Sequence, residues 1–308
     1  MMAVFDLHCD TITEYNKRGY NFKDGGGHYS FANLPKGECW CQCFAIWMPD
    51  ELRGPAAEGY FEENYRFFIS QLEQYPRCIG QAFTLQDVQN LMKQGRNPAI
   101  LTVEGGSALA GKLERVAYLR GLGVRMMTLT WNGVNEIAAG STSQGGVSEF
   151  GRAAIAEMER QGIIVDVSHL NEQSFDEVME MVTRPVVASH SNSRSVFGHK
   201  RNLTDEQFLT IVRQGGLVGI NLYKEFIDSD NPSFSRLMDH IKHFIDLGGE
   251  YNIALGSDFD GADVPEYVSS PAKLANLRPV MIQSGLSGEQ VENLYYCNAK
   301  RFFERYGL

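Results

Sequence analysis

The stretch Val-Phe-Asp-Leu-His-Cys-Asp, residues 4–10, is a short apolar run that reaches a His-x-Asp pair. In an extended strand alternate side chains share a face, so we expect His8 and Asp10 to point the same way and Cys9 the other way. Such a pair can bind a metal ion. A surface histidine beside a solvated aspartate would explain two residues equally well, because so short a motif is weak alone. Repetition along the chain favours the metal site.

Four later apolar runs also end on, or lead directly to, a histidine or a carboxylate. A carboxylate that ends an apolar strand and is followed by two glycines resembles a ligand more than a surface charge, since glycine permits close backbone approach. Histidines at two of these ends could be satisfied core residues, and the last aspartate could cap a loop. Their shared position at strand ends favours metal binding over these separate explanations. The runs are 99–103, 163–169, 186–190 and 252–258, which lead to Glu104, His169, His190 and Asp258.

Eight apolar runs alternate with helical patterns, and no linker marks a domain boundary. This alternation predicts a (β/α)8 TIM barrel of the α/β class, forming one domain over residues 1–308. A doubly wound sheet also alternates, but only a closed barrel brings the first and eighth strands to one point. The expected strands are 4–10, 38–48, 99–103, 124–131, 163–169, 186–190, 217–223 and 252–258. The expected helices are 60–75, 85–94, 107–120, 150–161, 171–182, 204–214, 234–247, 276–285 and 289–306, with a glycine-rich loop at 11–36.

The composition of the chain indicates which partners and which cellular compartment to expect. The 308 residues are 43% hydrophobic and 21% charged, as in an ordinary globular protein. The formal net charge is −10 and the basic residues form no run, which argues against a nucleic-acid partner or an anionic membrane surface. Cys39, Cys41 and Cys43 alternate too closely for ordinary disulfide pairing, so we expect buried thiols in a reducing compartment. With no signal-like segment and no apolar run of bilayer length, we expect a cytoplasmic protein.

The residues expected at the rim of the barrel predict bound metal ions. Three imidazoles and three carboxylates in one mouth are costly without bound metal, because carboxylates packed together cannot all stay ionised. Two divalent ions would resolve this. Nitrogen and carboxylate ligands without thiolates suit zinc best, with manganese, cobalt and iron as alternatives. Glu104 is the natural bridge, because each of its oxygens can reach one ion of a pair about 3.5 to 4 Å apart that shares a water or hydroxide.

Six motifs, in their order along the chain, resemble the membrane (renal) dipeptidase family of binuclear zinc peptidases in the amidohydrolase superfamily. They are Phe-Asp-Leu-His-Cys-Asp, Val-Glu-Gly-Gly, Val-Asp-Val-Ser-His, Ala-Ser-His-Ser, Lys-Arg-Asn-Leu and Gly-Ser-Asp-Phe-Asp-Gly. The resemblance covers nearly the whole chain. It implies that His8, Asp10 and Glu104 hold one zinc, and that Glu104, His169 and His190 hold the other. It also implies a homodimer.

The same resemblance implies roles for residues around the metals. Asp258 matches the acid/base residue, Arg201 matches the arginine that binds the substrate carboxylate, and Tyr223 matches another substrate contact. Without the resemblance, Arg201 would be interpreted as a surface arginine in the basic cluster 199–201. The chain departs from the mammalian members at Trp131, where they have a histidine thought to stabilise the oxyanion; either Trp131 or Asn132 substitutes, or turnover and substrate choice differ.

These observations predict a metal-dependent dipeptidase that cuts dipeptides with a free C-terminal carboxylate, including L-D dipeptides as the resemblance suggests. In its chemistry a hydroxide bridging two zinc ions attacks the scissile carbonyl, and Asp258 passes the proton to the leaving amine. A barrel of the same superfamily acting on another amide or a lactone is one alternative, which loss of Arg201 would distinguish. A catalytically silent metal-binding homologue, motivated by Trp131, is another. The chain resembles the soluble bacterial branch of the family.

Overall fold

A computed structural model describes residues 3–308, in which nine strands form one parallel sheet. Most strands are three to nine residues long and buried along almost their whole length, as expected for a parallel sheet covered on both faces. Their bounds are β1 Ala3–Cys9, β2 Cys39–Trp47, β3 Ile79–Gln81, β4 Asn97–Glu104, β5 Val124–Thr128, β6 Ile164–Asp166, β7 Val187–Ala188, β8 Leu217–Ile220 and β9 Ile253–Leu255.

The sheet closes on itself. Its strand order is β2-β1-β9-β8-β7-β6-β5-β4-β3, and an additional pairing of β2 with β4, from Gln42↔Ala99 to Trp47↔Glu104, joins the two ends. Strand β3 lies outside the closed ring and pairs only with the start of β4 in the described chain. The remaining eight strands form the predicted (β/α)8 TIM barrel of the α/β class. The three-residue strand β3 was not predicted, because so short a run carries no readable pattern.

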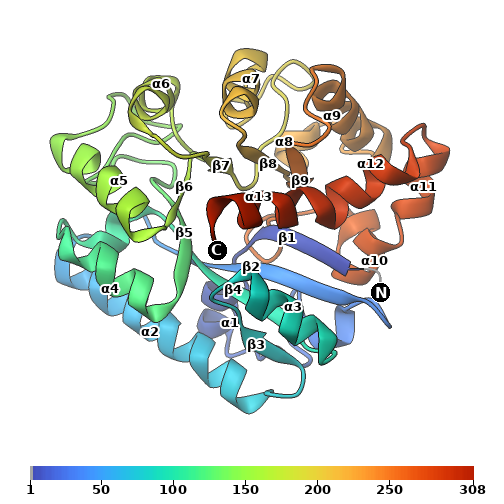
Figure 1. Ribbon diagram of the computed structural model, residues 1–308, viewed down its shortest axis with the longest axis horizontal. Helices are drawn as coiled ribbons and strands as arrows, with labels where there is room; N and C mark the ends of the chain where they lie inside the picture. The colour runs from blue at the N-terminus through green and yellow to red at the C-terminus, as the bar shows by residue number, and fades with distance from the viewer. Residues whose placement is uncertain (1–2) are drawn as a thin grey trace.

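The helices surround the barrel in a ring, as Figure 1 shows. Within the described residues, no helix combines the length and the apolar character needed to cross a membrane. The α-helices are α1 Thr11–Arg18, α2 Gly54–Gln74, α3 Leu85–Lys93, α4 Glu114–Leu122, α5 Glu149–Gln161, α6 Glu172–Met181, α7 Asp205–Arg213, α8 Lys224–Ile227, α9 Phe234–Asp246, α10 Pro271–Ala275, α11 Arg278–Gln283, α12 Gly288–Glu292 and α13 Asn298–Tyr306. Shorter turns are η1 Phe31–Asn33, η2 Gly106–Leu109, η3 Glu266–Val268 and the π-helical η4 Asn293–Cys297.

One end of the barrel is covered by the last helix. In Figure 1, α13 lies across the mouth of the strands, in front of them. The Phe303 ring packs against Phe5 of β1 with ring centroids 4.8 Å apart, and the Asn298 side chain donates to the Ile253 carbonyl at 2.8 Å. The Cys41 and Cys43 thiols of β2 are buried, as predicted. With its N-terminal end covered, the barrel offers the opposite, C-terminal end to ligands.

Two local predictions were wrong. Residues 11–36 are not all loop, because α1 begins at Thr11 and ends at Arg18, and Gly19, with a left-handed φ of 67°, caps it. Asp10 is therefore the residue before a helix rather than the end of a strand. The helix predicted over 107–120 is interrupted, because Ala110 takes a left-handed φ of 52° after η2 and α4 begins only at Glu114.

Candidate metal centre

Six residues predicted from the sequence lie together at the C-terminal end of the barrel. His8 is part of β1, and Glu104 is the last residue of β4. The others lie in the first residues after a strand, where the chain leaves the sheet. All six are buried or nearly so, with exposed fractions of 9% or less. The residues outside the strands are Asp10 after β1, His169 after β6, His190 after β7 and Asp258 after β9.

The first group of side chains, which we call the His8 set, joins His8 and Asp10 to one oxygen of Glu104. His8 Nε2 lies 3.4 Å from Asp10 Oδ2 and 3.5 Å from Glu104 Oε2. Asp258 lies beside this set, with its Oδ1 3.8 Å from His8 Nε2. The His8 set therefore offers one imidazole nitrogen and carboxylate oxygens from two residues.

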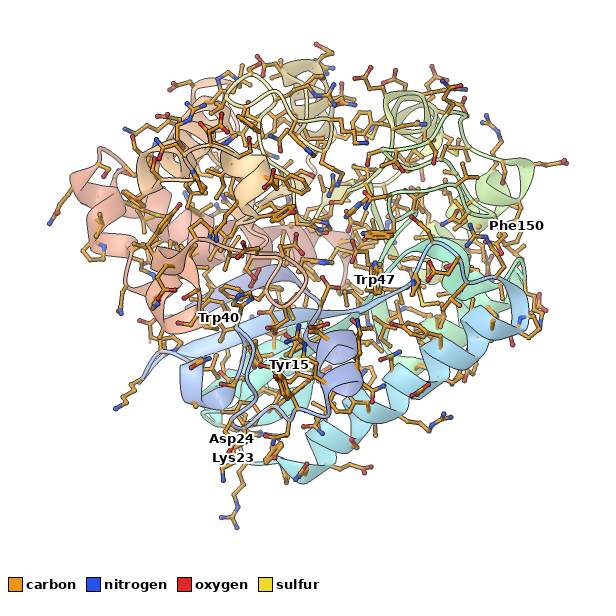
Figure 2. The ribbon with its side chains drawn as sticks, turned by 180° about the vertical axis from the view of Figure 1, so that it is seen from behind. Tyr15, Lys23, Asp24, Trp40, Trp47 and Phe150 are labelled. Atoms are coloured by element: carbon orange, nitrogen blue, oxygen red, sulfur yellow. The ribbon has the colours of Figure 1, made fainter. Side chains whose placement is uncertain are left out.

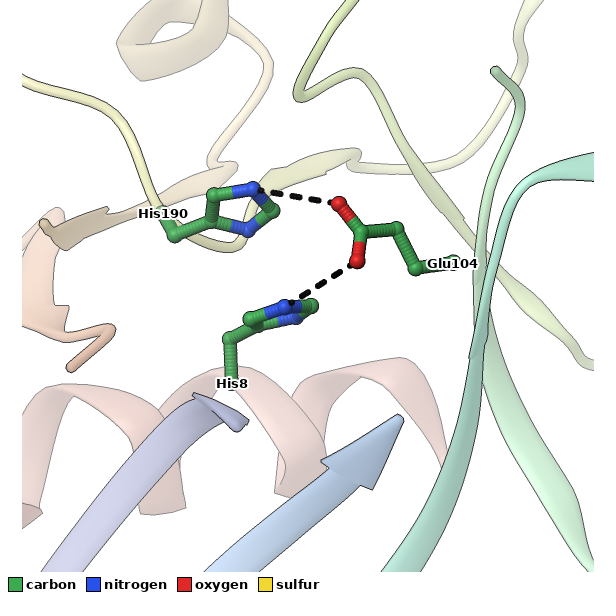
Figure 3. A group of neighbouring side chains, drawn as sticks. All are labelled: His8, Glu104 and His190. Atoms are coloured by element: carbon green, nitrogen blue, oxygen red, sulfur yellow. Dashed lines mark ion pairs between the residues drawn. The ribbon is translucent and has the colours of Figure 1, made fainter. Parts of the chain in front are cut away.

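The second group, the His169 set, uses the other oxygen of Glu104. Glu104 Oε1 lies 2.8 Å from His169 Nε2 and 3.6 Å from His190 Nε2. The two imidazole nitrogens are 2.8 Å apart. Figure 3 shows Glu104 between His8 and His190, with each carboxylate oxygen paired to a different histidine. A carboxylate placed in this way could reach a separate cation with each of its two oxygens.

The side chains fit a metal centre because two of their buried polar atoms make no hydrogen bond in the described chain. His8 Nε2 and Asp10 Oδ1 are buried and make no hydrogen bond within the described chain. His169 Nδ1 is 3.0 Å from Asn132 Oδ1, and His190 Nδ1 is 2.8 Å from Ser189 Oγ. If each Nδ1 carries the proton, the two Nε2 lone pairs face each other, which is unfavourable unless a cation binds both. Nitrogen and carboxylate donors without a thiolate suit zinc.

Burial and neighbouring charges shift the pKa values of the three histidines in different directions. Burial, together with the charge of His8, lowers the pKa of His190 well below its usual value. Burial, reinforced by Arg201, also lowers the pKa of His169. Burial opposes a charge on His8 as well, but the carboxylates of Asp10 and Glu104 outweigh it and raise the pKa of His8. The His169 set thus presents two neutral imidazoles, the form that binds metal.

The backbone at two of these positions adopts a conformation that non-glycine residues rarely take. His169 has φ 71° and Asp258 has φ 60°, both in the left-handed region. Asp258 is held there by its own N–H, which donates to the His8 carbonyl at 3.2 Å, and its Oδ2 accepts from Asn221 Nδ2 at 2.9 Å. Strain of this kind concentrates at functional sites. Asn221 was not predicted, although it follows the apolar run of β8 and the strand-end argument would have found it.

A cavity of about 430 Å³ opens above the metal-binding side chains. Its wall contains an aromatic pair, since Trp47 of β2 and Trp131 pack edge to face with ring centroids 5.0 Å apart. Trp47 lies near the middle of the face shown in Figure 2, opposite α13. The lining residues are Asp10, Thr13, Glu14, Lys17, Trp47, Glu104, Trp131, Asn132, His169, Tyr223, Phe226, Asp258, Asp260, Gly261 and Ala262. Trp47, Phe226 and the α1 residues were missed, because only the folded chain brings them to the rim.

Three of the four predicted substrate-binding residues line the cavity, and the fourth, Arg201, is buried beside it. Trp131, Asn132 and Tyr223 line the cavity. Asn132 Oδ1 is already occupied, because it contacts His169 Nδ1 and accepts from Ser141 Oγ at 3.1 Å. Arg201 is not a surface residue, being 6% exposed beneath the rim. It is not itself a lining residue, but Phe226, which lines the cavity, packs against its guanidinium.

Arg201 is buried without a carboxylate partner in the described chain. Its Nη2 donates to the His190 carbonyl at 3.3 Å, and its guanidinium lies 5.3 Å from the centre of the Phe226 ring. Its Nε makes no hydrogen bond. Burial lowers the pKa of Arg201 to about 10. A buried guanidinium without an anionic partner is costly, so this position favours an anionic ligand.

The chain is similar to solved metallopeptidases and to curated dipeptidases. A metallopeptidase from Rhodobacter sphaeroides, solved with a phosphinate mimic of the dipeptide L-Ala-D-Ala, is 25% identical with a TM-score of 0.93, and 99% of each chain is covered. The metallopeptidase named dipeptidase AC is 26% identical with the same TM-score and the same coverage. Dipeptidase aclJ from Aspergillus oryzae is 30% identical over 278 residues, covering 85% of this chain and 66% of that protein.

The chain spans 53–66% of the length of three curated dipeptidases that it matches. The model of one family, described as membrane dipeptidase (peptidase family M19), matches residues 1–306. That match covers the barrel and every side chain of the His8 and His169 sets. The chain belongs to the membrane dipeptidase family, peptidase family M19.

Proposed function

We propose that this chain is a metal-dependent dipeptidase, acting as one barrel domain over residues 1–308, that hydrolyses dipeptides with a free C-terminal carboxylate. The observation that carries the proposal is Glu104, whose two oxygens face two different ligand sets at the floor of one cavity. Family membership supports the reaction class. The Rhodobacter relative with its L-Ala-D-Ala mimic supports substrates whose second residue is D-configured.

Two ions would bind at this floor. His8, Asp10 and Glu104 would hold one, while Glu104, His169 and His190 would hold the other. Zinc is the first candidate for both, and manganese, cobalt and iron are alternatives. When bound, the ions would supply a Lewis acid for the scissile carbonyl and a more acidic water.

Asp258 is the proposed acid/base residue. Its Oδ2 is engaged by Asn221, so Oδ1, on the side of His8, is the oxygen left to take a proton. In this proposal Asp258 Oδ1 accepts the proton of the attacking water and then donates it to the leaving amine. General acid/base transfer of this kind contributes about 10²- to 10⁴-fold to a rate.

Arg201 and Tyr223 are the proposed contacts of the substrate's C-terminal residue. Arg201 is buried beside the ligand His190 and has an unused Nε, so a substrate carboxylate would supply its missing anionic partner. A guanidinium binds a carboxylate with two parallel hydrogen bonds, which fixes the distance from the carboxylate to the scissile bond. Tyr223 lines the cavity and packs against Phe226, the ring that the Arg201 guanidinium also contacts.

Trp131 and Asn132 are proposed to have different roles. Asn132 uses its carbonyl oxygen on His169 and so supports that ligand, while its Nδ2 group keeps its N–H donors for the substrate. Trp131 packs on Trp47 and closes one wall of the cavity. This wall limits the side chains that fit beside the scissile bond, and the charge of the mammalian histidine has no equivalent at this position.

A dipeptide panel tests the proposal most simply. The zinc-loaded protein is assayed with dipeptides varied in both residues and in chirality, and with their C-terminally amidated forms as matched controls. We expect turnover of the free acids and little of the amides. Turnover of N-acyl amino acids or lactones alone would favour another amidohydrolase activity. Zinc binding without turnover of any substrate would favour a silent homologue.

A further inference from the structure

A buried carboxylate lies behind one of the proposed ligands. Ser189 Oγ donates to Asp166 Oδ2 at 2.5 Å and contacts His190 Nδ1 at 2.8 Å on its other side. Asp166, Ser189 and His190 are each 1% exposed or less. The three side chains therefore form one continuous chain of polar atoms that water does not reach.

The remaining bonds of Asp166 fix the direction of this chain. Asp166 Oδ1 accepts from the backbone N–H groups of Ser168 and Ser189, each at 3.0 Å. Its Oδ2 accepts from Thr128 Oγ1 at 2.6 Å as well as from Ser189. A carboxylate can only accept, so the single hydroxyl proton of Ser189 points to Asp166. The lone pairs of Ser189 Oγ are then left for a proton on His190 Nδ1.

We propose that Asp166 and Ser189 are positioning residues that hold His190 in the tautomer with its proton on Nδ1, so that Nε2 is free to bind metal in the His169 set. The inference rests on the metal centre of the proposed function. Partners that fix the tautomer of a ligating histidine raise its affinity for metal. The other histidine of the set, His169, has the neutral amide of Asn132 as its partner. The buried carboxylate of Asp166 therefore acts on His190 and not on His169.

Asp6 and Ser257 form a second buried aspartate–serine pair, which resembles Asp166 and Ser189 but does not contact an imidazole ring. Asp6 Oδ1 accepts from the Ser257 N–H at 2.8 Å, and Asp6 Oδ2 accepts from Ser257 Oγ at 2.5 Å. Ser257 Oγ lies 3.1 Å from the His8 carbonyl, where Ser189 Oγ has His190 Nδ1. Asp6 and Ser257 thus join neighbouring strands in the same way as Asp166 and Ser189, without contacting a ligand ring.

Asp166→Asn should reverse the direction of the hydrogen bonds among residue 166, Ser189 and His190, with little change in the shape of the side chain. The two backbone N–H groups require an oxygen at the Oδ1 position, so the amide nitrogen must occupy the Oδ2 position. There it donates to Ser189 Oγ, and the Ser189 proton turns to His190 Nδ1. That bond favours the tautomer with the proton on Nε2, where the ion would bind. In Asp6→Asn the freed Ser257 proton meets the backbone carbonyl of His8, which accepts it without a change at either ring nitrogen of His8.

The test is zinc affinity, measured on the full chain by competition with a chromogenic chelator. We expect Asp166→Asn and Ser189→Ala to weaken one zinc site by roughly 10- to 100-fold, and Asp6→Asn and Ser257→Ala to leave both sites unchanged. The ring ¹⁵N shifts of His190 provide a second measurement, which we expect to show the proton moving from Nδ1 to Nε2 in Asp166→Asn. Thermal unfolding of all four variants reports any general loss of stability.

Wild-type zinc affinity in Asp166→Asn, or an unchanged His190 tautomer, would overturn the inference. An equal loss in all four variants would also overturn it, since the effect would then be structural. A wild-type protein that binds no zinc at Glu104 would instead overturn the proposed function on which the inference rests.

Discussion

The His8 set and the His169 set share Glu104 but are built differently. His8 comes from β1, and Asp10, the residue before α1, brings a second carboxylate. His169 and His190 come from neighbouring strands and bring two neutral imidazoles, each with a hydrogen-bond partner on its outer nitrogen. The first set would therefore attract a cation mainly by charge, whereas the second would do so by ligands whose tautomers are fixed in advance.

Loss of the shared carboxylate should have the largest effect. Glu104→Gln removes a charged oxygen from both sets, so we expect zinc to be lost from both and activity to fall to background. Elemental analysis of the purified variant measures the zinc content, with Glu114→Gln on the exposed surface of α4 as the control. Retention of one full zinc equivalent would show that the two sets do not share Glu104.

Loss of the acid/base residue should reduce the rate without disturbing either set. Asp258→Asn keeps its shape and its place beside Asn221, so we expect normal zinc content and a rate lower by about 10²- to 10⁴-fold. Asp263→Asn, on an exposed residue of the same loop, is the control. An Asp258→Asn enzyme with wild-type kcat would remove this residue from the mechanism.

Loss of the partner of His169 should affect only the His169 set. Asn132→Ala removes the acceptor for His169 Nδ1, and we expect one zinc site to weaken by roughly 10- to 100-fold while the other is unchanged. Asn132→Asp keeps an acceptor at the same place and should retain affinity. Chelator competition measures both sites. Equal weakening of the two sites would contradict the separation of the sets.

A histidine outside both sets should have the smallest effect on metal. Buried His240 accepts from the Ser193 N–H and contacts the Ile227 carbonyl through its other nitrogen, so neither ring nitrogen lacks a partner. Burial lowers the pKa of His240 from 6.5 to about 4. The unfolded chain therefore binds this proton at a higher pH than the folded chain, and the stability involved is complete above about pH 6.5 and falls as the pH drops towards 4.

We expect this linkage to be worth as much as about 3 kcal/mol. Urea unfolding with chelator present, at pH 7 and pH 4.5, measures it against His240→Gln, in which the linkage is absent. An equal pH dependence in the two proteins would contradict the assignment. Zinc affinity of His240→Gln should match the wild type.

The sequence predicted the barrel and the residues at its rim for one physical reason. Parallel strands covered on both faces are almost wholly apolar, so a histidine or carboxylate directly after such a run stands out, as Glu104 and His190 do. Helix α1 could not be found this way, because it is short and begins inside a polar segment. Asp10 lies close to His8 as predicted, although it does so from a helix cap rather than a strand.

Long-range contacts account for what sequence reasoning missed. Trp47 reaches the cavity only because β2 pairs with β4, and the role of Asn132 depends on a contact with His169 from another loop. Motif order and family resemblance identified Arg201, but its burial without an anionic partner required the folded chain. Such features depend on which strands are neighbours, which no local pattern encodes.

An anomalous difference map of the zinc-loaded crystal, recorded at the zinc edge, would show directly whether Glu104 joins two metal sites. We expect two peaks on either side of Glu104, one within reach of His8 and Asp10 and the other within reach of His169 and His190. A single peak, or peaks that Glu104 does not join, would contradict this expectation.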